Sequence, residues 1–175
     1  MILKRLFSRK PDIAEKLYAA IVAAARQPAF YRDLAVPDNI DGRFDMVTLH
    51  VFLVLDRLRS EGESVAALRQ DLTDTFFADM DQSLRQMGVG DISVGKKVRK
   101  MAEAFFGRIG AYQTALGNDP DTLQAALARN IYVGQPEATA AALAAWVRQA
   151  RTVLAAQSKE NIIGGKLEFH ENHRS

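Results

Sequence analysis

The chain has 175 residues, of which 48% are hydrophobic and 25% are charged, and its formal net charge is +2. This length and composition predict one globular domain with a substantial core. So small a net charge gives no indication of DNA binding, and no DNA partner is expected. The chain contains no cysteine, which excludes disulfides, thiolate metal sites and cysteine nucleophiles.

The amino-terminal segment MILKRLFSRK contains four basic side chains among apolar ones. No apolar run long enough for a secretory signal follows it. Residues 1–10 are therefore treated as a separate basic segment, which either lies on an anionic membrane surface or is a solvated chain end. The longest apolar run, Met46 to Leu55, is far shorter than the roughly 20 residues that span a bilayer. The sequence predicts a cytoplasmic protein.

Apolar residues recur at three- and four-residue steps through most of the chain, which is the helical period. No internal repeat and no two-residue alternation long enough for a sheet is found. The prediction is an all-α fold, a single compact bundle of about six helices over residues 11–158, followed by a loose tail, residues 159–175. The expected helices cover residues 11–27, 44–60, 64–87, 93–116, 121–132 and 137–158.

A long irregular loop, residues 30–43, is expected between the first two helices, because prolines, glycine and aspartates gather there. Loops of this length inside compact domains are often functional. The helix that follows reads as buried nearly all round, with a narrow solvent stripe at Asp45, Thr48, Asp56 and Arg59. His50 and Arg57 fall on its apolar side, so they must find partners or line an opening.

The sequence lacks essential parts of three kinds of enzyme or metal site. The segment from Gly90 to Lys97 satisfies GxxxxGK, but it follows a helix, and Lys97 stands where a phosphate-binding loop has Ser or Thr. No Glu-x-x-His pair is present for a helical di-iron site. No serine stands in a nucleophile elbow, and His50 is better explained as a structural residue than as a base. The sequence predicts no catalytic residue, no metal and no cofactor, and hence not an enzyme.

Four basic residues lie close together on the helix expected over residues 93–116: Lys96, Lys97, Arg99 and Lys100. They form either a plain solvated face or a contact with an anionic surface, such as lipid headgroups or RNA phosphates. No aromatic residues alternate with them on that face, so base stacking is not indicated.

The stretch from Phe30 to His50, FYRDLAVPDNIDGRFDMVTLH, resembles the ubiquinol–cytochrome c chaperone family in its alphaproteobacterial form. The segments VFLVLDRLRSEG and FFADMDQSLRQMGVGDISVGKKVRKMAEAFFGRIGAY resemble it too, so the similarity covers roughly residues 30–116. The positions that match the family pattern are Tyr31, Pro37, Asp38, Asp41, Gly42, Arg43, Phe44, Leu49 and His50. Mitochondrial members tend to carry a tryptophan near Arg43–Phe44, and this chain does not.

The resemblance implies a non-enzymatic assembly factor for ubiquinol–cytochrome c reductase, respiratory complex III. It implies as partners newly made cytochrome b or another reductase subunit, a small partner protein or the ribosome, and peripheral contact with the inner membrane. We expect the loop and the His50/Arg57 face to form one wall of a client groove, and the helix over residues 93–116 the other. The client-binding candidates are Tyr31, Pro37, Asp38, Asp41, Arg43, Phe44, His50 and Arg57.

Two other function classes remain open from the sequence. One is a helical carrier of a hydrophobic small molecule, a lipid or a quinone, which would need a large enclosed apolar pocket. The other is a structural interaction subunit. An open groove rimmed by charge would favour the chaperone.

Overall fold

A computed structural model describes residues 12–117 and 120–170 of the chain. Within these residues no strand occurs, and the all-α prediction is confirmed. The short 3-10 turns Gly62–Val65 and Glu137–Ala140 lead into α4 and α7. The helices are α1 (Ile13–Ala25), α2 (Pro28–Arg32), α3 (Ile40–Arg59), α4 (Ala66–Gln86), α5 (Asp91–Leu116), α6 (Pro120–Asn130), α7 (Ala141–Ala156) and α8 (Lys159–Ile163).

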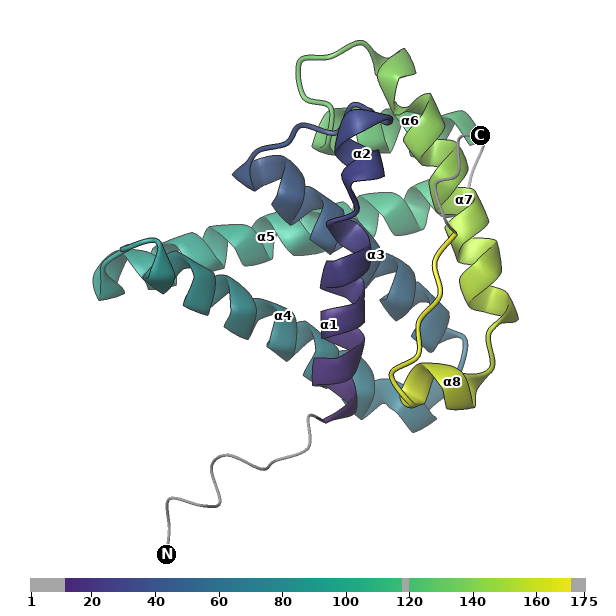
Figure 1. Cartoon of the computed structure of the whole chain (residues 1–175), viewed down its shortest axis with the longest axis horizontal. Coiled ribbons are helices and arrows are strands. Elements are labelled where there is room, and N and C mark those ends of the chain that lie inside the picture. Colours follow the sequence, from purple (N-terminus) through teal and green to yellow (C-terminus); the bar gives the residue numbers. More distant parts are fainter. Residues whose placement is uncertain (1–11, 118–119, 171–175) are drawn as a thin grey trace, which may run out of the picture.

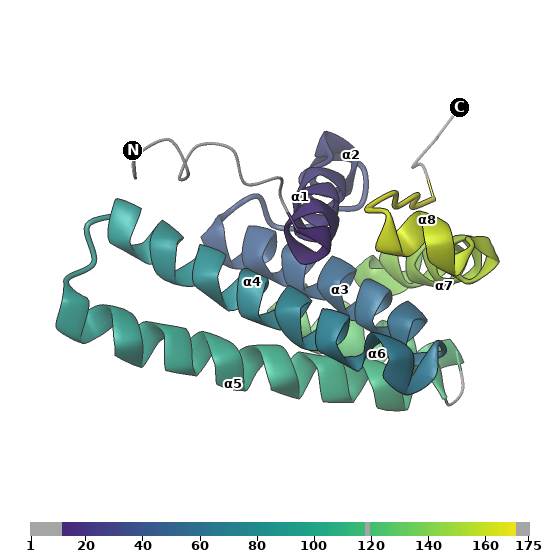
Figure 2. The ribbon, with the colours of Figure 1, turned by 90° about the horizontal axis from the view of Figure 1, so that it is seen from below.

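Helix α3 is the centre of the fold and contacts α1, α4, α5 and α7. Figure 2 shows it between the antiparallel α4–α5 hairpin on one side and α1 and α7 on the other. Its middle is buried on every side, whereas the sequence predicted a helix buried nearly all round with a narrow solvent stripe. The apolar residues buried along it are Met46, Val47, Leu49, Val51, Phe52, Leu53, Val54 and Leu58.

The stripe of α3 predicted to face solvent does not do so at its amino-terminal half. Asp45 and Thr48 are buried, because α5 packs across this side of the helix. Asp56, further along, is half-buried and its carboxylate accepts a hydrogen bond from Arg151 of α7. A helical projection places residues on a face, but it does not tell which faces another helix will cover.

The segment predicted as loop, residues 30–43, is partly helical. Pro28 stands at the first position of α2, where its missing N–H and fixed φ favour a helix start. Asn39 caps α3: its side-chain oxygen accepts a hydrogen bond from the Gly42 N–H at 2.8 Å. Helix α3 therefore begins at Ile40, four residues before the predicted start.

Within the tail predicted to be loose, residues 159–163 form a short helix, and Leu167 and Phe169 pack against the core. Ser158 caps the short helix α8, which buries Ile162 and contacts α1. Residues 166–170 then run between α1 and α7 (Figure 1). The basic segment, residues 1–10, and residues 171–175 lie outside the described part of the chain.

In the described residues, no helix combines the length and the apolar composition that crossing a membrane requires.

Candidate functional site

The loop after α2, the start of α3, the middle of α5 and the end of α6 line an open cavity of about 480 Å³. We call it the cleft. It brings the predicted loop and α5 together as two walls of one cavity. Its lining residues are Pro37, Asn39, Ile40, Asp41, Gly42, Phe44, Asp45, Lys100, Met101, Ala104, Arg108, Asn130, Ile131 and Val133.

Gly42 allows the loop to lie directly on the first turn of α3. A Cβ at this position would stand 1.9 Å from the carbonyl oxygen of Pro37, closer than real Cβ contacts ever are. Tyr132 holds the loop from the other end, because its hydroxyl donates a buried hydrogen bond of 2.7 Å to the Leu34 carbonyl. Ala35, between Leu34 and Pro37, has a positive φ of 54°, which is uncommon for a residue other than glycine. The loop wall is thus fixed by backbone contacts.

A buried ion pair joins the two walls. The Arg108 guanidinium lies 2.8 Å from an Asp45 carboxylate oxygen, and Asp45 is only 4% exposed. The same guanidinium carbon stands 5.6 Å from the centroid of the Phe44 ring, within cation–π distance. Burial raises the pKa of Asp45 to about 7, with Asp41 adding to the rise and Arg108 opposing it. The cleft therefore contains a carboxyl group that titrates near neutral pH.

Two more buried polar groups adjoin this pair between α3 and α5. Thr48 is one helical turn from Asp45, and the Tyr112 hydroxyl lies close enough that burial and Asp45 together raise its pKa. No described residue supplies a hydrogen-bond partner for the Thr48 hydroxyl, the Tyr112 hydroxyl or Arg108 Nε. Buried polar atoms are normally hydrogen-bonded, so this part of the α3–α5 interface is suited to hold water or a polar group of a ligand.

The titration of Asp45 predicts a difference in pH dependence between the wild type and Asp45→Asn. With its pKa raised from 3.8 to about 7, folded Asp45 keeps a proton that the unfolded chain releases. The free energy of unfolding of the wild type, relative to the variant, should therefore fall by about 3 kcal/mol from pH 4 to pH 7. Urea denaturation of both proteins across this range measures it. Parallel curves would show instead that Asp45 stays ionised beside Arg108.

Two large apolar side chains are exposed at the cleft. Ile40 is 68% and Val133 76% exposed, and charged Asp41 and Lys100 stand beside them. Exposed apolar anchors with a polar rim are the usual anatomy of a protein-binding surface. Sequence reasoning missed both residues, together with Asp45 and Arg108. The only indication in the sequence that Ile40 could be functional is its place inside the motif that resembles the chaperone family.

Of the predicted client-binding residues, Pro37, Asp41 and Phe44 line the cleft. Asp38 and Arg43 form an exposed ion pair of 2.8 Å at its edge. Tyr31 points the other way, since its hydroxyl donates to the Ala25 carbonyl at 2.9 Å and closes the corner between α1 and α2.

His50 and Arg57 are not in the cleft. Arg57 lies under α7, where it donates hydrogen bonds of 2.9 Å to the Leu154 and Gln157 carbonyls at the end of that helix. His50 is fully buried on the side of α3 that faces α7. The structure therefore does not join these two residues and the loop into one wall.

The four basic residues are all exposed on α5, and they divide between two places. Lys100 lines the cleft. Lys96 and Lys97 lie nearer the turn between α4 and α5, and Arg99 pairs with Glu103 at 3.4 Å. Among residues 12–117 and 120–170, His, Asp and Glu side chains nowhere gather in a group of three that could hold a metal ion.

Comparisons with known proteins bear on the family of this chain. The model of the ubiquinol-cytochrome C chaperone family matches residues 32–169. Ubiquinol-cytochrome-c reductase complex assembly factor 1 of Xenopus laevis is 26% identical over 118 residues, 67% of this chain and 59% of the relative. The Homo sapiens protein of the same name is 27% identical over 119 residues, 68% of this chain and 40% of the relative. The chain thus spans only about half the length of these curated relatives.

A solved structure extends the similarity over most of the chain. The crystal structure of the Cbp3 homolog from Brucella abortus superposes with a TM-score of 0.80 at 43% sequence identity, covering 91% of this chain and 89% of that one. With the family match over residues 32–169, the conclusion is that this chain belongs to the ubiquinol-cytochrome C chaperone family.

Proposed function

We propose that this chain is a non-enzymatic chaperone that binds a newly made subunit of ubiquinol–cytochrome c reductase and assists its assembly, with cytochrome b as the client. The observation that carries the proposal is the cleft, whose exposed apolar side chains Ile40 and Val133 stand next to charged groups in a family of reductase chaperones. An apolar client segment would use these side chains as anchors and Asp41 and Lys100 as its polar boundary. A small partner protein or the ribosome would bring the client to the cleft.

The composition of the cleft favours a protein client over a small hydrophobic molecule. A carrier of lipid or quinone calls for a mostly apolar enclosed pocket. The cleft instead carries Asp41, Asp45, Lys100 and Arg108 on its walls. Charged groups of both signs suit the edges of a polypeptide better than a lipid tail.

The double substitution Ile40→Ser with Val133→Ser tests the proposal without touching the core, because both side chains are mostly exposed. Loss of two apolar anchors is expected to weaken client binding by at least about tenfold. The measurement is the amount of reductase subunits that co-purify with the tagged chain from detergent-solubilised membranes of the native host.

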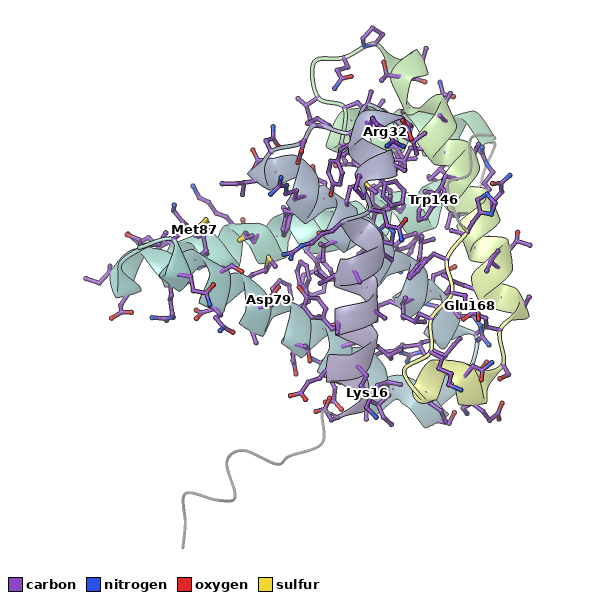
Figure 3. All side chains as sticks on the ribbon, viewed as in Figure 1. Lys16, Arg32, Asp79, Met87, Trp146 and Glu168 are labelled. Carbon is purple, nitrogen blue, oxygen red and sulfur yellow. The ribbon has the colours of Figure 1, made fainter. Side chains whose placement is uncertain are left out.

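The matched control is Met87→Ser with Ile92→Ser, two side chains that are 55% and 87% exposed at the turn between α4 and α5. Figure 3 labels Met87 at the far end of that hairpin. This control should capture as much client as the wild type. Equal capture by the Ile40/Val133 variant and the wild type would remove the cleft from the binding site.

We further propose that the chain works on the cytoplasmic side of the inner membrane and that Lys96 and Lys97 contact anionic lipid there. Neither lysine has a described acidic partner, and each one near a charged surface contributes about 1 kcal/mol of attraction. Lys96→Gln with Lys97→Gln should bind vesicles containing phosphatidylglycerol about thirtyfold more weakly in a sedimentation assay at low salt. Lys159→Gln with Lys166→Gln is the charge-matched control. An equal loss in both variants would mean that net charge, and not this face of α5, attracts the vesicle.

A further inference from the structure

The carboxyl-terminal tail lies in a groove between α1 and α7. Residues 166–170 run along it in extended form, and α3 lies beneath (Figure 1). We call this the tail groove. Small alanines of α1 form one side, α7 the other, and His50 the floor. The residues of α1, α2, α3 and α7 that line it, with Gln27 between the first two helices, are Ala20, Ala23, Ala24, Gln27, Phe30, His50, Trp146 and Val153.

The side chains of the tail alternate between groove and solvent. Leu167 and Phe169 pack against the core, while Lys166, Glu168 and His170 are exposed. Phe169 stacks on Trp146 with ring centroids 6.5 Å apart. This two-residue period is that of an extended peptide with one face bound.

The hydrogen bonds that hold the tail are made to its backbone and not to its side chains. The Gln157 amide donates to the Glu168 carbonyl at 2.6 Å and accepts from the Glu168 N–H at 3.1 Å. The Trp146 indole N–H donates to the His170 carbonyl at 2.9 Å. Figure 3 labels Trp146 on α7 and Glu168 on the tail. Any extended peptide offers the same backbone groups, so these contacts do not select the sequence of the tail.

The tail does not complete the groove. A cavity of about 590 Å³ remains between the tail, α1 and α3. Phe30, Trp146 and Phe169 surround His50 with ring centroids 5.0–5.3 Å from its own. His50 Nδ1 lies 2.7 Å from the Met46 carbonyl, which only accepts, so Nδ1 carries a proton and Nε2 is left as an acceptor. Burial lowers the pKa of His50 to about 4 and keeps the ring neutral.

No described residue donates to His50 Nε2. A buried acceptor without a donor is costly, because it has lost its hydrogen bonds to water and gained none in return. An aromatic residue with an O–H or N–H in this cavity would supply a hydrogen-bond donor, which Phe169 lacks.

We propose that the tail groove is a binding site for an extended apolar segment of a partner protein, and that residues 166–170 occupy it in cis. The segment has apolar residues two positions apart, the second of them aromatic, with tyrosine or tryptophan preferred to phenylalanine. This interaction is separate from the cleft and does not depend on the proposed client. Recognition of an extended peptide through its backbone, with pockets for alternate side chains, is a common mode of peptide binding.

A peptide supplied in trans tests the proposal on the full-length chain. Leu167→Ser with Phe169→Ser weakens the bound tail, and the capped peptide GGKLEFH, which repeats residues 164–170, is titrated against it. Trp146 is the one tryptophan of the chain and lies in the groove, so its fluorescence reports occupancy. Saturable binding is expected, at least about tenfold tighter than to the wild type, where the tethered tail competes at an effective concentration on the order of millimolar.

Two peptides sharpen the result. GGKELFH has the same composition with adjacent apolar residues and should bind at least about tenfold more weakly. GGKLEYH should bind several-fold tighter than GGKLEFH, and equal affinity would overturn the role given to His50.

Circular dichroism checks that the Leu167→Ser, Phe169→Ser variant is folded. If it is not, Phe169→Ser alone is used in its place. A folded variant that binds no peptide, or binds no tighter than the wild type, would show that the tail is only a structural closure. Either result leaves the cleft proposal standing.

Discussion

Gly42→Ala is expected to lower the free energy of unfolding by about 3 kcal/mol and to displace the loop wall of the cleft. The new Cβ would stand 1.9 Å from the Pro37 carbonyl oxygen, and a backbone atom cannot rotate away as a flexible side chain can. Either the loop or the first turn of α3 must shift. Urea denaturation gives the change in stability, and client capture by the surviving folded fraction gives the effect on the cleft.

Gly107→Ala provides the matched control for this substitution. Gly107 lies inside α5, and a Cβ added there would have no neighbouring atom within 4 Å outside its own helix turn. The higher helix propensity of alanine should raise the free energy of unfolding by up to about 1 kcal/mol. Opposite signs for the two glycine-to-alanine changes are the expected outcome. A neutral Gly42→Ala would mean that the loop is not held against α3.

Arg57→Met is expected to cost about 3 kcal/mol of stability, although arginine is a residue type that usually lies at the surface. Its side chain is only 10% exposed and pairs with Glu61 at 2.6 Å. Its hydrogen bonds to the Leu154 and Gln157 carbonyls satisfy the open end of α7. Methionine keeps the apolar stem but leaves these partners without a donor. The measurement is the midpoint and slope of urea denaturation.

Arg57→Lys separates charge from geometry in this contact. Lysine keeps the positive charge, but it lacks the planar fork that reaches two carbonyls and a carboxylate at once. It should recover less than half of the loss. Full recovery by lysine would show that the charge near the end of α7 is what matters.

The six long helices are predictable because each carries an apolar stripe at the helical period. Helix α3 is predicted to be mostly buried because apolar residues dominate positions 46–55. The local signals for α2 and for the start of α3 are present in the sequence but ambiguous. Pro28 reads as a helix stop, although a proline serves equally well as the first residue of a helix. Asn39 reads as a turn residue, although it is also a strong helix cap.

What the sequence does not predict depends on contacts between distant residues. The helical projection correctly places His50 and Arg57 on an apolar side of α3, but nothing local indicates that α7 covers that side. Asp45 reads as solvent-facing because it is charged, and only its contact with Arg108, far along the sequence on α5, explains its burial. Leu167 and Phe169 are too few to mark an extended segment, so the bound tail reads as loose.

Site-specific crosslinking in the native host tests whether the cleft holds the client. A photoreactive phenylalanine analogue is placed at Ile40 in one strain and at Ile92 in another, since both side chains are mostly exposed. After irradiation, crosslinked proteins are identified by mass spectrometry. If the cleft holds the client, position 40 crosslinks to a subunit of ubiquinol–cytochrome c reductase, cytochrome b first, and position 92 crosslinks to none. Reductase crosslinks from both positions alike, or from neither, would contradict it.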